Sequence, residues 1–267
     1  MALYDGVSGV AREVSKKDDG VSAVAREVAV AYDGVSGVAR EYFKSGTPLS
    51  SLAVGSTVYM KVNGVSKAFI VVHQGRPSTA YDTSCNGTWL LMKDIYETRA
   101  WHSEYYNWYR RSTIHSYLNT TFLNLFESGV INAIKQVKVP HVNNYGSYAM
   151  DTENPVSSGS NGLSTRIFLL SFIEVGFNND DNYYFIEGSV LSYFSGAADS
   201  KRAAYLNGSA VNWWLRSPDT TSSSTVALVN PGGYGGAQNA NKIGGVRPAL
   251  VLPSSLLVDD AFNVIAA

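Results

Sequence analysis

Four histidines are the residues of this chain best suited to bind a metal or transfer a proton. They are His73, His102, His115 and His141. No two of them are four residues apart, so a single helix cannot present two imidazoles to one metal ion. The spacing favours structural or surface histidines, and we expect no bound metal.

A run of aspartates and asparagines at 178–182 could offer oxygen ligands to calcium. Asp180 and Asp181 lack the spaced acidic positions and the final bidentate glutamate of a calcium loop. The chain also has no GxSxG motif, no GxxxxGK[ST] phosphate loop and no GxGxxG after a strand. The sequence therefore predicts no cofactor and no enzymatic activity. A hydrolase of surface glycans, acting through a pair of carboxylates, is the alternative.

Two arginines beside prolines mark two rigid blocks in the last quarter of the chain. Arg216 lies in NWWLRSP and Arg247 in GVRPALVLP. We expect both arginines to hold loops by donating to backbone carbonyls, with a ligand anion as the alternative partner. Trp213 and Trp214 can each bury ~150–250 Å², which predicts that they anchor the core. The segment VRPALVLP, which includes Pro248, has the composition of a buried strand.

The residues between these blocks, 219–241, are mostly Ser, Thr, Gly, Asn and Ala. Only Val226 to Val229 has the pattern of a strand. The remainder combines adaptable polar residues with Tyr234, a composition typical of binding loops. A rigid frame around such a segment predicts a recognition site, whereas a plain surface hairpin is the alternative.

Composition limits the possible partners and compartments. The 267 residues are 45% hydrophobic and carry a formal charge of −1, so nothing favours binding to nucleic acid or insertion into a membrane. Cys85 is the single cysteine, which excludes a disulfide within the chain. The start of the sequence has no basic segment followed by an apolar one, and we expect no signal peptide.

The first 45 residues contain three repeats of 14 residues, beginning at Tyr4, Asp18 and Tyr32. Each repeat has Gly-containing turn signals and then an alternating Val-Ala-Arg-Glu segment, which predicts one strand per repeat. Three such strands bury too little surface to be stable alone. We therefore expect residues 1–45 to form an all-β stalk that trimerises or docks on a larger assembly, with a loosely ordered linker as the alternative.

Residues 46–267 have the pattern of one α+β domain. Asn63-Gly64 predicts a hairpin, and a strand is expected from Thr88. A helix is predicted over 112–126 with Ser112 as its cap, followed by a short helix over 128–136. The strand VKVPHV, a long loop over 143–162 and a buried strand over 166–177 are expected after it.

Several of these blocks resemble a family of phage and gut-bacterial domains of unknown function. NWWLRSP and GVRPALVLP resemble its C-terminal end, and PLSSLAVGSTVYMKVNGV, TWLLMKDIY and STIHSYLNTTFL resemble earlier parts. The resemblance spans about residues 47–257, and the YDGVSGVAREV repeats are similar to those found ahead of such domains in phage structural proteins. The family is similar to the C-type lectin-like fold of formylglycine-generating enzymes and of the variable proteins of diversity-generating retroelements.

This resemblance implies a phage-encoded receptor-binding protein of a tail or virion, acting outside the cell on a bacterial surface protein or glycan. The implied variable contacts have residue types reachable from Asn codons: Asp219, Thr220, Thr221, Ser222, Ser223, Asn230, Tyr234, Asn239 and Asn241. The implied scaffold is Trp213, Trp214, Arg216, Arg247 and Pro248. Enzymatic cysteines and a calcium-binding Glu-Pro-Asn motif are absent, and Glu153-Asn154-Pro155 has the wrong order. A structural virion or cell-surface module without a variable ligand is the alternative.

Overall fold

The protein is described by a computed structural model that covers residues 4–7, 10–13, 46–149, 155–178 and 183–266. In the first repeat, β1 (Tyr4–Val7) pairs with β2 (Val10–Glu13) as an antiparallel hairpin. The prediction of one strand per repeat is therefore wrong for this unit. Two four-residue segments separated by two residues can pair with each other inside the repeat. The second and third repeats lie outside the described residues, so the predicted stalk stays a prediction.

The first five-stranded sheet of the described domain has the order β12-β19-β6-β5-β4. Its strands are β4 (Thr57–Val62), β5 (Val65–Gln74), β6 (Thr88–Met92), β12 (Ile167–Phe168) and β19 (Ala249–Leu252). The predicted hairpin is confirmed, because Asn63 and Gly64 have φ of 51° and 74° and join β4 to β5. Every residue of β6 and β19 is buried, as expected for central strands of a covered sheet.

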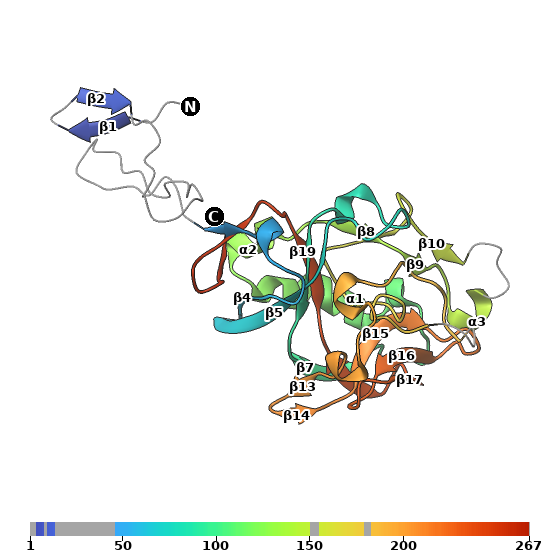
Figure 1. The fold of residues 1–267 in the computed structure, drawn as a ribbon. Helices are drawn as coiled ribbons and strands as arrows, with labels where there is room; N and C mark the ends of the chain where they lie inside the picture. The colour runs from blue at the N-terminus through green and yellow to red at the C-terminus, as the bar shows by residue number, and fades with distance from the viewer. Residues whose placement is uncertain (1–3, 8–9, 14–45, 150–154, 179–182, 267) are drawn as a thin grey trace.

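The second five-stranded sheet of the described domain has the order β17-β16-β15-β18-β7. Its strands are β7 (Glu97–Ala100), β15 (Trp213–Pro218), β16 (Thr225–Val229), β17 (Gly235–Asn239) and β18 (Ile243–Val246). The strand at Val226 to Val229 is confirmed, whereas β17 is additional. Figure 1 shows β15, β16 and β17 on the side of the domain away from β4 and α2 (Ser128–Ala133).

The chain passes directly from one of these sheets to the other at two places, from β6 to β7 and from β18 to β19. The second passage falls at Arg247 and Pro248, inside the segment that we predicted as one buried strand. That prediction is wrong in one respect, because Pro248 has no N–H to continue the ladder of β18. Residues 246–252 are all buried, but the two halves of the block belong to different sheets.

The predicted helix over 112–126 is confirmed in position. It begins as α1 (Thr113–Tyr117), continues as a π-helical turn (Leu118–Phe122) and ends as a 3-10 turn (Leu123–Leu125). Ser112 caps it, because its Oγ accepts a hydrogen bond from the His115 N–H at 3.2 Å. The second helix, α2, is three residues shorter than predicted.

Short elements complete the domain and cover its edges. They are β3 (Thr47–Pro48), β8 (Val137–Val139), β9 (His141–Val142), α3 (Gly146–Ala149), β10 (Val156–Ser157), β11 (Leu163–Thr165), β13 (Tyr205–Leu206), β14 (Ser209–Ala210), β20 (Leu257–Val258) and β21 (Val264–Ile265). Four described 3-10 turns lie between them, at Leu49–Ser51, Thr83–Cys85, Ser192–Phe194 and Asp199–Lys201, and a fifth, Tyr109–Arg111, precedes α1. The architecture is α+β and mostly β, as predicted at that level.

The structure corrects the prediction for the apolar segment 166–177. We predicted a buried strand, but only Ile167 and Phe168 pair in a sheet. The backbone then turns, and Gly176 has a φ of 80°. Leu169 and Leu170 are nevertheless fully buried, so hydrophobicity predicted the burial of this segment but not its geometry.

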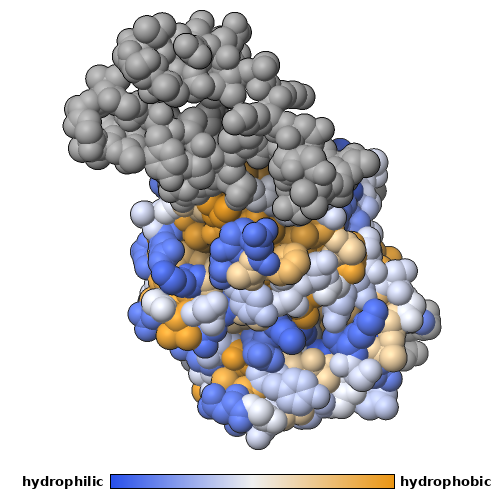
Figure 2. Space-filling view, turned by 60° about the vertical axis from the view of Figure 1, so that its left-hand side comes forward, coloured by the Kyte–Doolittle hydropathy of each residue, from blue (hydrophilic) through white to orange (hydrophobic). Residues whose placement is uncertain are grey.

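Figure 2, in which the left-hand side of Figure 1 comes forward, shows a surface of mixed hydropathy. In the coloured part of this view, hydrophilic residues alternate with patches of hydrophobic residues. No helix in the described part of the chain is long and apolar enough to cross a membrane.

Candidate functional site

Arg216 is the centre of a buried ionic network behind the predicted recognition loop. β15 directs its guanidinium into the core, where it is fully buried and donates to both carboxylate oxygens of Glu174, at 2.6 and 2.8 Å. It also donates to the carbonyls of Leu169 and Pro140, at 3.0 and 3.1 Å. Burial alone would lower the pKa of Arg216, but Glu174 and Glu187 outweigh that effect and raise it.

Two further groups extend this network. The Tyr81 hydroxyl donates to Glu174 Oε1 at 2.8 Å, and the Val142 N–H donates to Glu187 Oε1 at 3.0 Å. Burial raises the pKa of Glu187. Arg216 thus binds carbonyls as predicted, and in addition it neutralises an acidic side chain that the sequence did not indicate.

Arg247 holds the junction between the two sheets. It donates to the carbonyls of Met92 and Lys93, at 2.9 and 3.1 Å, and its guanidinium lies 4.8 Å from the ring centre of Trp213. Burial lowers the pKa of Arg247 to about 10. Its carbonyl-binding role agrees with the prediction.

The paired tryptophans are the predicted core anchor. Trp213 and Trp214 are fully buried, and each indole N–H has a backbone partner. Trp213 donates to the Arg202 carbonyl at 2.9 Å, and Trp214 donates to the Arg99 carbonyl at 3.0 Å. These bonds fix β15 against β7 and against the segment that precedes β13.

The loop after β15 is held by its own side chains. Asp219 Oδ1 accepts from the N–H and the hydroxyl of Thr221, at 2.8 and 2.7 Å. Ser222 Oγ accepts from the N–H groups of Ser224 and Thr225, both at 3.1 Å. Such local side-chain bonds stabilise turns without help from distant segments.

An aromatic segment that the sequence analysis missed lies along this loop. Asn107 donates through its backbone N–H to the Ser223 carbonyl at 2.8 Å, and through its amide to the carbonyls of Ser222 and Thr225, at 2.9 and 2.8 Å. Asn239 donates to the Tyr105 hydroxyl at 2.6 Å. The signal was present in the sequence, because residues 101–109 contain five aromatic residues.

The rings of this segment form a cluster with a neighbouring element. Tyr106 and Trp108 contact Tyr145, with ring centres 5.3 and 5.6 Å apart. Gly146 follows at the start of α3, and a Cβ there would lie 1.7 Å from the Asp219 carbonyl oxygen, so only glycine fits this approach. Three separate segments therefore meet at one surface.

We call this surface the loop face. It comprises Tyr105, Tyr106, Trp108, Tyr145, Tyr183, residues 219–224, Asn239 and Asn241. Tyr105 is 56% exposed, and Tyr183, whose carbonyl accepts from the Thr220 N–H, is similarly exposed. Thr220 itself is only 4% exposed, so it supports the loop instead of facing a ligand.

Two of the predicted contact residues lie elsewhere. Asn230 and Tyr234 occupy the turn at the opposite end of the β16–β17 hairpin, since Thr225 pairs with Asn239 and Val229 pairs with Gly235. Asn230 Oδ1 accepts from the Tyr234 N–H at 3.1 Å, and the Tyr234 side chain is 57% exposed. The structure therefore separates the predicted contacts into two groups, and only one of them belongs to the loop face.

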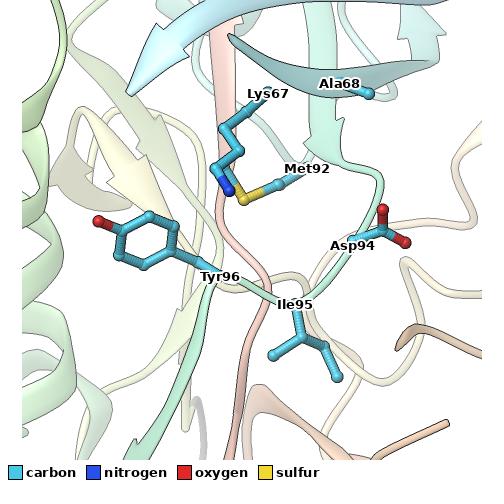
Figure 3. A pocket seen from close by; sticks show the side chains of 6 residues that line it. All are labelled: Lys67, Ala68, Met92, Asp94, Ile95 and Tyr96. Atoms are coloured by element: carbon cyan, nitrogen blue, oxygen red, sulfur yellow. The ribbon is translucent and has the colours of Figure 1, made fainter. Parts of the chain in front are cut away.

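A small hollow lies between β5, the end of β6 and the connection from β6 to β7, and it contains no residue of the loop face. Its lining residues are Lys67, Ala68, Met92, Asp94, Ile95 and Tyr96. In Figure 3 the Lys67 side chain extends toward Met92, while Asp94 stands on the other side of the hollow. The hollow contains none of the residues that the sequence indicated.

Within the described ranges, no group of three or more His, Cys, Asp or Glu side chains could hold a metal ion. Residues 179–182, which include the weak calcium candidate, lie outside those ranges, as does most of the Glu153-Asn154-Pro155 segment.

Taken with the fold, this geometry defines an α+β, mostly β domain in which a buried frame supports an exposed loop face. The chain belongs to the family described as "Domain of unknown function (DUF6273)", which matches residues 86–254. The matched range includes Trp213, Trp214, Arg216 and Arg247 and every residue of the loop face. Neither a curated protein nor a solved structure matches the chain.

Proposed function

We propose that the protein is a non-enzymatic ligand-binding protein whose loop face contacts a bacterial surface. The observation that carries this proposal is the meeting of exposed tyrosines and short polar side chains over a buried frame. Tyrosine gives a large contact area at a low entropic cost, and Ser, Asn and Thr supply adaptable hydrogen bonds. The local bonding of Asp219 and Ser222 supports tolerance to exchange, since their partners lie in the same turn.

The proposal includes the narrower expectations drawn from resemblance. These are a C-type lectin-like fold of the formylglycine-generating-enzyme type, a phage origin, display on a tail or virion, and diversification of the loop by a retroelement. The framing of the loop by two buried blocks supports the fold, and the Asn-derived residue types support diversification. Trimerisation through residues 1–45 would let weak sites act together, raising apparent affinity by ~10²–10⁴.

The test is cell binding by a triple alanine variant at Tyr105, Ser223 and Asn241. We expect loss of binding with an unchanged melting temperature, because these side chains are at the surface. The control is Tyr205→Ala, which removes a comparably exposed tyrosine outside the loop face. Binding that survives the triple variant would contradict the proposal, as would an equal loss of binding in the control.

Diversification has its own test. Sequencing the gene across one natural population should show substitutions clustered in 219–241 at template adenines, next to a near-identical repeat of that segment. An invariant segment without such a repeat would favour the second candidate, a structural virion or cell-surface module. That module predicts that deletion of residues 3–45 disrupts assembly, while deletion of 219–241 spares attachment.

A further inference from the structure

Three of the four histidines lie behind the loop face, on three different elements. His102 follows β7, His115 belongs to α1 and His141 belongs to β9. The His102 ring packs against Tyr106 with ring centres 4.0 Å apart, and the His115 ring packs against Tyr109 at 5.0 Å. The first contact lies within the segment 101–111, which carries Tyr105 and Tyr106 of the loop face, and the second joins that segment to α1.

Several ring nitrogens of these histidines lack a hydrogen-bond partner. In the part of the chain that the structure describes, Nε2 of His102, Nε2 of His115 and both nitrogens of His141 are buried without a hydrogen-bond partner. His102 Nδ1 accepts from the Ser103 N–H at 2.8 Å, so the ring proton is placed on Nε2. A neutral imidazole can occupy such sites, but an imidazolium adds a second donor and a charge that requires solvation.

The charges around these rings also disfavour a further cation. His141 faces Arg216 of β15, Arg110 of the segment before α1, and His115. His115 likewise faces Arg110, whereas His102 faces the exposed Glu104. Glu187, which accepts from the neighbouring Val142 N–H, has a raised pKa because of burial and therefore takes up a proton itself as the solution becomes acidic.

We propose that His102, His115 and His141 make the segment 101–111 an acid-sensitive element, which detaches from the domain in mildly acidic solution and takes the loop face apart. Release of a bound ligand by this route rests on the proposed function. The detachment itself rests only on the packing and charges of the histidines.

The direction of the effect follows from the two protonation equilibria. Burial lowers the pKa of His115 and His141 to about 4. In an open or unfolded chain the pKa of histidine is about 6.5. Between these values the open state binds more protons, so opening becomes more favourable as the pH falls, and above about 6.5 the effect disappears.

The test is hydrogen exchange of the full chain at pH 7.5 and 5.0, with rates corrected for intrinsic chemical exchange. We expect amides of 101–111 to open about tenfold more often or better at the lower pH, while β5 and β6 keep their protection. The double variant His115→Phe with His141→Phe keeps two aromatic rings that cannot titrate, and it should lose most of the response, because only His102 of the three histidines remains. His73→Phe, which removes a histidine bonded to Ser192, should retain it.

Unchanged exchange of 101–111 at pH 5.0 would overturn the inference, as would an equal response in the double variant. If that variant does not fold, NMR titration of the wild-type histidines decides, because pKa values near 6.5 for His115 and His141 contradict the proposal. The proposed function can be contradicted independently of this inference. If the acid response is intact but the Tyr105, Ser223 and Asn241 substitutions leave cell binding unchanged, the proposed function is wrong and the acid-sensitive element remains supported.

Discussion

The buried frame and the loop face differ in the sequence separation of their hydrogen bonds. In the frame, Arg216 bonds to Glu174, 42 residues away, and Arg247 bonds to Met92, 155 residues away. In the loop, Asp219 bonds to Thr221, two residues away, and at the far end of the hairpin Asn230 bonds to Tyr234, four residues away. A change in the loop therefore disturbs one turn, whereas a change in the frame disturbs several segments.

Asn107 and Tyr105 are the exceptions, and they show how the two regions are joined. Both lie in the aromatic segment, and both bond to residues more than 100 positions away in the loop face. Hydrogen bonds within the loop determine its conformation, but its position on the domain depends on the aromatic segment.

The largest effect is expected from Arg216→Met. It leaves the carboxylate of Glu174 buried without its cation, which typically destabilises a protein by about 3–5 kcal/mol. Urea unfolding measures the change. The double variant Arg216→Met with Glu174→Gln should recover part of the loss, and a loss below about 1 kcal/mol for the single variant would contradict the role of the frame.

The effect of acidification through each single histidine is expected to be smaller. Lowering the pH from 7.5 to 5.0 should cost on the order of 2 kcal/mol for each of His115 and His141, because their folded-state pKa of about 4 lies below the unfolded value. Stability is retained above pH 6.5 and lost progressively toward pH 4. His141→Phe should remove its share of the pH dependence, as measured by urea unfolding at both pH values, and equal slopes would contradict the assignment.

Asn107→Ala tests the link between the two regions. It leaves the carbonyls of Ser222 and Thr225 without this donor, and we expect a loss of about 1–3 kcal/mol with weaker cell binding. Thermal unfolding and binding to whole cells measure the two effects. A stable variant with normal binding would show that the loop is positioned without the aromatic segment.

The smallest effects are expected in the loop face itself. Ser223→Ala and Asn241→Ala should each change stability by less than about 0.5 kcal/mol, as surface substitutions usually do. Asp219→Ala should cost slightly more, because it removes the acceptor for Thr221. Differential scanning calorimetry measures all three, and a loss comparable to that of Arg216→Met would make the loop a structural element.

Local patterns predicted local structure well. Asn63-Gly64 specified its hairpin through left-handed backbone geometry, and Ser112 specified the start of its helix through a side-chain cap. Predictions failed where a distant partner decides the geometry. The segment 166–177 is apolar like a strand, yet it turns where Ser171 and Glu174 bond each other and Glu174 meets Arg216.

The candidate site divides in the same way. The sequence by itself determined the buried tryptophans, the two framing arginines and the polar composition of 219–241, because residue type and nearby prolines carry that information. Only the tertiary structure decided that Tyr105, Asn107 and Tyr145 join the loop and that Asn230 and Tyr234 leave it. Those placements depend on strand register and on bonds between segments over 100 residues apart, which no local pattern records.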